Sequence, residues 1–435
     1  VTSSGWTLYV TSADRTAYLD GNDEVEKALL ARGTSVYFHG DVIPMLPEGI
    51  SRDLCALSED TIRPALVCKM LVTDDGRVAE YEFMKASVRS RAKLTYAAVD
   101  RYVTGHNDEL IAWSNPLEAL VQAYRALRRY REEHELVMED RQEYRWHLNE
   151  NKQIETIDKG EKLASQHLVE ECMIATNRSA ASLLTSANAT GPFVIHSGFR
   201  KDRLDEAREF LSRYQPELVD VKLETLEGYR QVLTTLSQPH PQPLRGMVNR
   251  LLTRAAFSIQ SREHMGMGLP AYTNATSPLR KYLDFMAHRQ IKAVLEKSTA
   301  DNVAGGMLSK TSEMIARSRE ASQAAERWLT HNYLEKLKGD GKLHFSGVVC
   351  HITSAGFTVR LDETGLEGVV DLRQDPEKFS FDKWTASLTS TTRRFQLNQA
   401  VHVNYGGVAA GGDHVVVFTL DEHSGLKPPK EGSEG

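Results

Sequence analysis

The chain has 435 residues, of which 41% are hydrophobic and 26% are charged, and its formal net charge is −6. This length allows about two or three domains, and the composition is typical of a soluble globular protein with a sizeable core. No apolar run approaches the roughly 18 residues of a membrane helix, which argues against a membrane partner. The acidic balance does not itself indicate nucleic-acid binding, although an acidic protein can still line one channel with cations.

The four cysteines are far apart and include no Cys-x-x-Cys pair. This spacing argues against a zinc site and a disulfide framework, so we expect no disulfide partner and a reducing, cytoplasmic location. The first residue is Val1, and residues 5–10 already have a strand pattern. We therefore expect the natural protein to extend further upstream.

The first hundred residues predict strands and loops. The nearly continuous apolar run at 65–72 is typical of a buried strand, and residues 77–86 alternate between apolar and polar side chains. An Asp-Asp-Gly sequence at 74–76 separates them, so this stretch is predicted to form a β-hairpin.

A helical pattern begins at Ser114. Ser114 or Asn115 can cap this helix, and Pro116 suits the first helical position, where the N–H group that proline lacks would be unpaired anyway. Residues 191–199 are a predicted strand. Further helices are predicted at 161–185, 202–214, 222–236, 243–259, 278–296 and 307–338. These elements predict one large α+β body.

The pattern changes near residue 340. Residues 343–372 and 399–420 contain short strands with glycines at the bends, which predict a small closed barrel. The end of the chain is polar and rich in proline and glycine, as is typical of a disordered tail. The fold class is thus α+β followed by a small all-β barrel. The predicted domain limits are 1–340, 341–421 and, for the tail, 422–435.

The residues around Arg280 predict an anion site. Ser277 is expected to cap a helix that has Pro278 at its first position, so Arg280 would lie in the first helical turn, beside free backbone N–H groups. A guanidinium there can hold a phosphate with two hydrogen bonds, and Asp284, four residues on, can fix its direction. The alternative is an ordinary capped helix with a surface ion pair.

Several long motifs resemble the ribonuclease II and ribonuclease R family, the RNB exoribonucleases. The strongest is "AYTNATSPLRKYLDFMAHRQ" at 271–290. The barrel resembles the OB-fold RNA-binding domain of ribosomal protein S-one type that follows the RNB-type catalytic domain. The resemblance covers nearly the whole chain. Further matching segments, in the same order as in the family, are 42–70, 91–99, 136–146 and 168–184.

The resemblance implies roles for individual residues. Arg280 matches the arginine that steadies the scissile phosphate, and Tyr37 matches a tyrosine beside the terminal nucleotides. Tyr96 and Glu170 match residues that grip the last nucleotides. Core packing is the alternative for the two tyrosines, and a solvated helix face is the alternative for Glu170. Met138 stands where the family commonly has a phenylalanine that stacks on a base, so it is either a weaker base clamp or a core residue.

The family's cofactor is Mg²⁺, held by an aspartate cluster that lies upstream of the strand at 6–10, so the resemblance implies no metal ligand in this chain. Asp14, Asp20 and Asp23 lie nearby without the family's spacing and are interpreted as part of a polar turn. A further departure is Ser322, which replaces a family glutamate near the RNA end.

The resemblance implies hydrolysis of single-stranded RNA from its 3′ end, with release of nucleoside 5′-monophosphates. The alternative is a catalytically inactive RNA-binding relative that has lost its metal site. Single-stranded RNA is the expected partner in both cases, and the sequence does not indicate protein partners.

Overall fold

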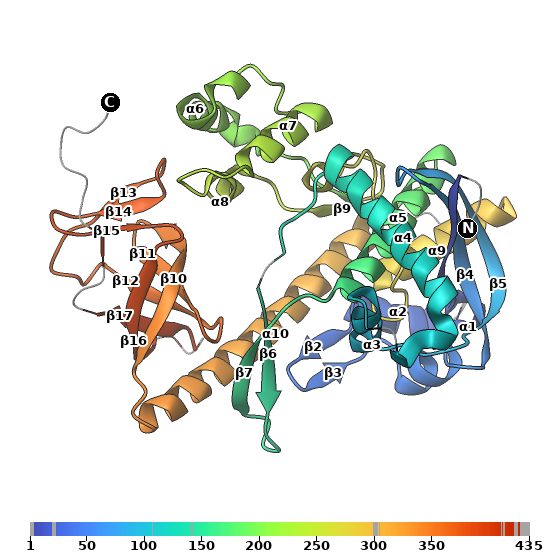
Figure 1. Cartoon of the computed structure of the whole chain (residues 1–435), viewed down its shortest axis with the longest axis horizontal. Helices are drawn as coiled ribbons and strands as arrows, with labels where there is room; N and C mark the ends of the chain where they lie inside the picture. Colours follow the sequence, from blue (N-terminus) through green and yellow to red (C-terminus); the bar gives the residue numbers. More distant parts are fainter. Residues whose placement is uncertain are drawn as a thin grey trace.

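The structure is a computed structural model of the chain. Figure 1 shows an α+β body that is joined by one long helix, α10 (Gly305–Gly339), to a C-terminal barrel. This arrangement confirms the predicted fold class. Within the described residues, no helix is both long and apolar enough to cross a membrane. The described residues are 4–19, 23–106, 108–140, 142–298, 303, 305–409, 411, 414–421 and 425–426.

The core of the body is an antiparallel sheet of order β1-β4-β5. Residues 65–68 of β4 are all buried, so side chains on both faces of the strand are covered, which explains the continuous apolar run in the sequence. The hairpin predicted from 65–86 is thus confirmed as β4 and β5. The strands are β1 (Gly5–Ala13), β4 (Ile62–Thr73) and β5 (Val78–Arg89). The main covering helices are α4 (Ser114–His134), α5 (Ala164–Ser186) and α9 (Tyr282–Glu296).

Smaller elements surround one end of this sheet. The short hairpin of β2 (Val36–Phe38) and β3 (Asp41–Ile43) extends from the body towards α10 (Figure 1). The others are α1 (Thr16–Leu19), α2 (Asp23–Arg32), a π-helix (Gly49–Leu54), α3 (Tyr96–Val103) and a 3₁₀-helix (Asp108–Trp113). This end of the sheet carries the candidate site.

A separate group of helices has its own apolar core, which we call the helical subdomain. Its helices are α6 (Leu204–Tyr214), α7 (Leu226–Leu236) and α8 (Leu244–Val248), with 3₁₀ turns at Lys201–Arg203, Pro216–Leu218 and Asn249–Leu251. The chain enters through β8 (Phe193–Ile195) and leaves through β9 (Ala256–Ser258), which pair with each other.

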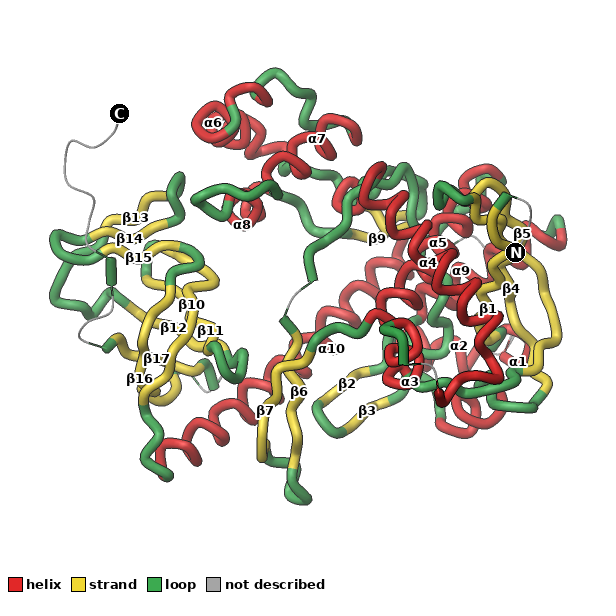
Figure 2. The backbone as a smooth tube through the Cα atoms, viewed as in Figure 1, coloured by secondary structure: helices red, strands yellow, loops and turns green. Residues whose placement is uncertain are grey.

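The barrel is closed in the order β10-β11-β12-β17-β16 (Figure 2). Its strands are β10 (His344–Thr353), β11 (Gly356–Leu361), β12 (Glu367–Asp371), β16 (Ala400–Val408) and β17 (Val416–Leu420). An inserted three-stranded sheet has β13 (Ser380–Asp382), β14 (Ser387–Thr389) and β15 (Arg394–Gln396). A hairpin of β6 (Glu143–Leu148) and β7 (Ile154–Gly160) packs on the barrel core through Trp146 and Ile157.

Three local predictions were wrong. Residues 243–259 do not form one helix, because 256–258 pair as a strand with β8. The helix predicted from 278 begins at Tyr282, because Lys281 has extended backbone angles and pairs with Thr34. The residue that precedes α4 is Trp113, and it makes no side-chain cap. In the first two cases, pairing with another segment replaced the local preference.

The predicted tail lies mostly outside the described residues. Leu426 is described, and its backbone exchanges two hydrogen bonds with Arg394 of β15, at 2.8 and 2.9 Å. That residue is therefore paired rather than disordered. The predicted domain limits stay predictions.

Candidate functional site

A pocket of about 560 Å³ brings Tyr37 and Arg280 together. We call it the Tyr37–Arg280 pocket. A second guanidinium, that of Arg52, also lines it, and no acidic residue is among its described lining residues. The lining residues are Thr11, Ser12, Ala13, Ser35, Tyr37, Val42, Pro44, Ser51, Arg52, Ala56, Leu57, Thr276, Ser277, Pro278, Leu279 and Arg280. Arg52 pairs with Glu48 at 3.3 Å, so Arg280 is the cation of this pocket best placed for an anionic ligand.

Backbone pairing between distant segments builds this pocket. The carbonyl oxygen of Arg280 accepts the N–H of Ser35 at 2.9 Å and the hydroxyl of Thr34 at 3.1 Å. The N–H of Tyr282 donates to the carbonyl of Gly33 at 3.0 Å. Gly33 has a φ of +68°, and a Cβ there would lie 2.8 Å from the Cβ of Met314, so only glycine fits this crossing. The strand that carries Tyr37 is thus fixed to the turn that carries Arg280.

Arg280 lies in a turn before α9, so its predicted place in the first helical turn was wrong. Its side chain is exposed, and one terminal nitrogen donates to the hydroxyl of Ser277 at 3.0 Å. Asp284 does not pair directly with Arg280. Instead, its buried carboxylate accepts the backbone N–H of Ser277 at 2.8 Å. Ser277 therefore stands between the two charged residues.

Tyr37 is 52% exposed, which excludes core packing as the reason for this tyrosine. Its backbone carbonyl accepts the hydroxyl of Ser322, on α10, at 3.1 Å. Ser322 thus lies beside the site, as the sequence comparison implied. Its hydroxyl supports Tyr37 and brings no negative charge to this position.

Tyr96, Met138 and Glu170 lie around the start of α5. Tyr96 is 50% exposed and Met138 is 65% exposed, so the core-packing alternative is wrong for both. Glu170 is half-buried and pairs with Lys162, which also contacts Asp140 at 3.2 Å. The side chain of Glu170 is 43% exposed, so a solvated helix face with an ion pair remains the alternative for this residue. Contact with RNA remains a prediction for all three residues.

A buried ionic network holds the base of the segment that carries Met138. Glu171 pairs with Arg131 at 2.6 Å and with Arg128 at 3.3 Å, and it is almost wholly buried. Glu135, which follows α4 directly, pairs with Arg178 at 2.5 Å. Burial raises the pKa of the Glu135 carboxyl, and the arginines oppose this rise. The network fixes the point where the chain leaves α4 towards Met138.

The described residues do not fit a metal ion. They contain no group of three or more His, Cys, Asp or Glu side chains placed to ligate one. Asp14 is buried, and its carboxylate accepts the N–H of Thr16 at 3.0 Å and pairs with Lys292 at 3.1 Å. Asp20 and the side chain of Asp23 lie outside what the structure describes.

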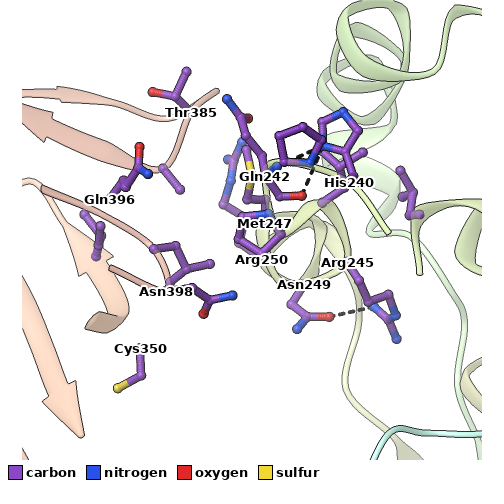
Figure 3. A pocket seen from close by; sticks show the side chains of 18 of the residues that line it. His240, Gln242, Arg245, Met247, Asn249, Arg250, Cys350, Thr385, Gln396 and Asn398 are labelled. Carbon is purple, nitrogen blue, oxygen red and sulfur yellow. Dashed lines mark hydrogen bonds between the residues drawn. The ribbon is translucent and has the colours of Figure 1, made fainter. Parts of the chain in front are cut away.

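A larger pocket, of about 880 Å³, lies between the helical subdomain and the barrel (Figure 3). Arg245, Arg250 and Lys383 line it, with Glu139 as the acidic residue among its lining residues. Arg245 donates to the side-chain oxygen of Asn249 at 2.7 Å. This pocket is polar and mainly basic, and none of the five site residues predicted from the sequence lines it.

The sequence reasoning missed the supporting residues Thr34, Ser35 and Ser277 as contacts of Arg280. No local pattern could have shown the first two, because their partner lies about 246 positions away in the chain. The four-residue spacing predicted a direct pair between Asp284 and Arg280. In the structure, Asp284 binds Ser277, and Ser277 binds Arg280.

The curated relatives of this chain include proteins named ribonuclease R and exoribonuclease 2. The sequence profile of the RNB domain matches residues 1–297, so the chain belongs to the RNB domain family. It is 31% identical over 422 residues to ribonuclease R of Escherichia coli, covering 93% of this chain and 52% of that protein. It is 32% identical over 425 residues to exoribonuclease 2 of Glaesserella parasuis, covering 92% of this chain and 64% of that protein. The resemblance found in the motifs is confirmed, and the chain spans about half to two thirds of these relatives.

Solved structures share the fold. RNase R of Mycoplasma genitalium, in complex with ribose-methylated single-stranded RNA, matches with a TM-score of 0.83 at 21% identity, over 97% of this chain and 68% of that one. Yeast Ssd1, a pseudonuclease, matches with a TM-score of 0.64 at 15% identity, over 88% of this chain and 48% of that one. At these identities the likeness shows the fold alone.

Proposed function

We propose that the chain holds the 3′ end of single-stranded RNA for stepwise hydrolysis to nucleoside 5′-monophosphates. The observation that carries this proposal is the meeting of Tyr37 and Arg280 in one pocket. A guanidinium can bind a phosphate with two charge-assisted hydrogen bonds, and it also stabilises the negative charge that develops there during hydrolysis. An exposed tyrosine can stack on a base, which requires an unpaired strand.

Magnesium is part of this proposal only through the family resemblance. The described residues do not supply its ligands, so other residues would have to hold it. When bound, the metal would activate water and neutralise the leaving oxygen. The residues of this chain bind the RNA end, set the position of the phosphate and exclude a duplex. A cytoplasmic location belongs to the same proposal, because all four cysteines are free.

A second candidate is an RNA-binding protein without catalysis. It is favoured by the lack of a metal-binding group among the described residues. Incubation with single-stranded RNA and Mg²⁺ separates the two candidates. Nucleoside 5′-monophosphates that disappear in Arg280→Ala would establish hydrolysis by this chain, whereas bound but intact RNA supports the second candidate.

RNA binding through Arg280 can be tested by fluorescence anisotropy with a labelled single-stranded oligouridylate, in EDTA, over a series of salt concentrations. We expect Arg280→Ala to weaken binding about tenfold, the scale of one hydrogen bond to a charged group. The slope of log affinity against log salt should fall by about 0.7, the value for one phosphate contact on a single strand.

Arg77→Ala is a matched control, because Arg77 is an exposed arginine beside the opposite end of β4. It should leave both the affinity and the salt slope unchanged. A blunt-ended duplex of the same length should compete poorly with the single strand. Equal affinities and slopes for the parent and Arg280→Ala would refute the proposed role of the pocket.

A further inference from the structure

Three buried side chains hold the backbone of the turn that precedes Arg280. The N–H of Ala275 donates to the side-chain oxygen of Asn177 at 2.9 Å, and its carbonyl faces Nε2 of His288 at 2.7 Å. The N–H of Ser277 donates to Asp284 at 2.8 Å. The N–H groups of Ala275 and Ser277 and the carbonyl of Ala275 are therefore all held by buried side chains. The side chain of Arg280 lines the pocket.

Of these three side chains, Asp284 is the one that buries a carboxyl group without full hydrogen bonding, which costs free energy. It is 1% exposed, and burial raises the pKa of its carboxyl. Its second oxygen, Oδ2, has no hydrogen-bond partner in the structure. A buried carboxylate with one hydrogen bond costs free energy, and a neutral asparagine could accept the same N–H. Stability of the turn alone therefore does not explain a carboxylate at this position.

A negative charge on Asp284 can act on Arg280, on the pocket side of the turn. Burial raises the pKa of the Asp284 carboxyl, and Lys281 and Arg280 oppose this rise and so favour the charged carboxylate. A carboxylate strengthens its hydrogen bond to the N–H of Ser277 relative to a neutral acceptor. The hydroxyl of Ser277 then accepts from the guanidinium of Arg280 at 3.0 Å. Two successive hydrogen bonds thus connect Asp284 of α9 to Ser277 and Ser277 to Arg280.

We propose that Asp284 is a positioning residue for the RNA phosphate, acting through Ser277 on Arg280. Asp284 fixes the backbone of Ser277, and the hydroxyl of Ser277 holds the guanidinium at the pocket. Arg280 then meets the phosphate with less side-chain entropy to lose. This inference rests on the proposed function, because it assumes that Arg280 contacts RNA.

The test is a double-mutant cycle on binding of the same labelled oligouridylate in EDTA. Asp284→Ala and Ser277→Ala should each weaken binding about threefold, which is less than the loss in Arg280→Ala because both act only through the guanidinium. In an Arg280→Ala background, both substitutions should leave the RNA affinity unchanged, because the guanidinium that they act on is then absent. Asp284→Asn keeps an acceptor without the charge and should fall between Asp284→Ala and the parent.

Asp14→Asn is the matched control. Asp14 is also a buried aspartate against α9, but its carboxylate is bound by Lys292 and Thr16 and not by Ser277 or Ala275. It should lower the melting temperature and leave RNA affinity unchanged. If Asp284→Ala does not fold, Ser277→Ala tests the positioning role by itself, because the loss of a single hydroxyl oxygen is the smaller change.

The outcomes separate the two proposals. If Arg280→Ala does not weaken binding, the proposed function fails. If Arg280→Ala weakens binding but Ser277→Ala and Asp284→Asn do not, only the positioning role fails. Losses of equal size with and without Arg280 would show a general structural role and would also overturn the inference.

Discussion

His288 shows how one side chain under the site depends on pH. It is fully buried on α9, and burial lowers its pKa to about 4. Its Nε2 lies 2.7 Å from the carbonyl oxygen of Ala275, which can only accept, so the neutral ring carries its proton on Nε2. The imidazole that must stay neutral therefore also holds the turn before Arg280.

We expect His288 to make the protein less stable in acid. Its pKa is about 6.5 in the unfolded chain and about 4 in the folded one, so the unfolded state binds more protons as the pH falls. Its stabilisation is present above pH 6.5 and is lost towards pH 4. Between pH 7 and pH 5 the loss is about 2 kcal/mol. Urea unfolding of the parent and His288→Gln at both pH values measures it. Equal pH dependence in both proteins would contradict this.

At the scale of elements, the sequence predicted what local patterns determine. The apolar run of β4, the turn after it and the two-strand pattern of 399–420 are all present in the structure. Two of the three errors fall where a distant segment pairs: β9 with β8, and Lys281 with Thr34. The candidate site shares this limit, because motif matching identified Arg280 and Tyr37, but their shared pocket depends on long-range pairing.

The network between α4 and α5 gives a prediction at this scale. Glu171→Gln should leave the buried guanidinium of Arg131 with Glu135, at 3.4 Å, as its remaining carboxylate partner. The free energy of unfolding should fall by about 1.5–3 kcal/mol, the scale of a hydrogen bond to a charged group. Glu132→Gln is the control, because Glu132 pairs with Arg128 on the exposed side of α4 at 2.6 Å. That pair should be worth less than about 1 kcal/mol. Urea unfolding compares the variants, and similar losses would contradict the assignment.

In the whole molecule, the barrel contacts the helical subdomain through Trp384, between β13 and β14. The hydroxyl of Tyr214 donates to the carbonyl of Trp384 at 2.7 Å, and the guanidinium of Arg213 lies 4.6 Å from the centre of the indole ring. Glu206 pairs with Arg250 at 2.6 Å and Lys383 at 3.3 Å, and desolvation only partly opposes these cations, which lower its pKa to about 2. Apolar and ionic contacts thus close this junction together.

Trp384→Ala should loosen the junction without unfolding either part. Aromatic burial and cation–π contacts supply much of the attraction there, and the ionic contacts weaken in salt. We expect faster amide hydrogen exchange at 204–251 and 380–396, with no change in β10 and β11. Trp328→Ala, on the exposed face of α10, is the control. Unchanged exchange in Trp384→Ala would show that the indole is not needed for docking.

The 35-residue helix α10 is about 52 Å long, since each residue adds about 1.5 Å. Ser322 on this helix holds Tyr37, and twelve positions on Leu334 is embedded in the barrel core. On the same hairpin, His39 stacks at 3.9 Å on Trp146, which also packs against the barrel. A tilt of the barrel must therefore displace the strand that lines the pocket. A load applied to the barrel would therefore reach the pocket as mechanical strain through α10 and the β2–β3 hairpin.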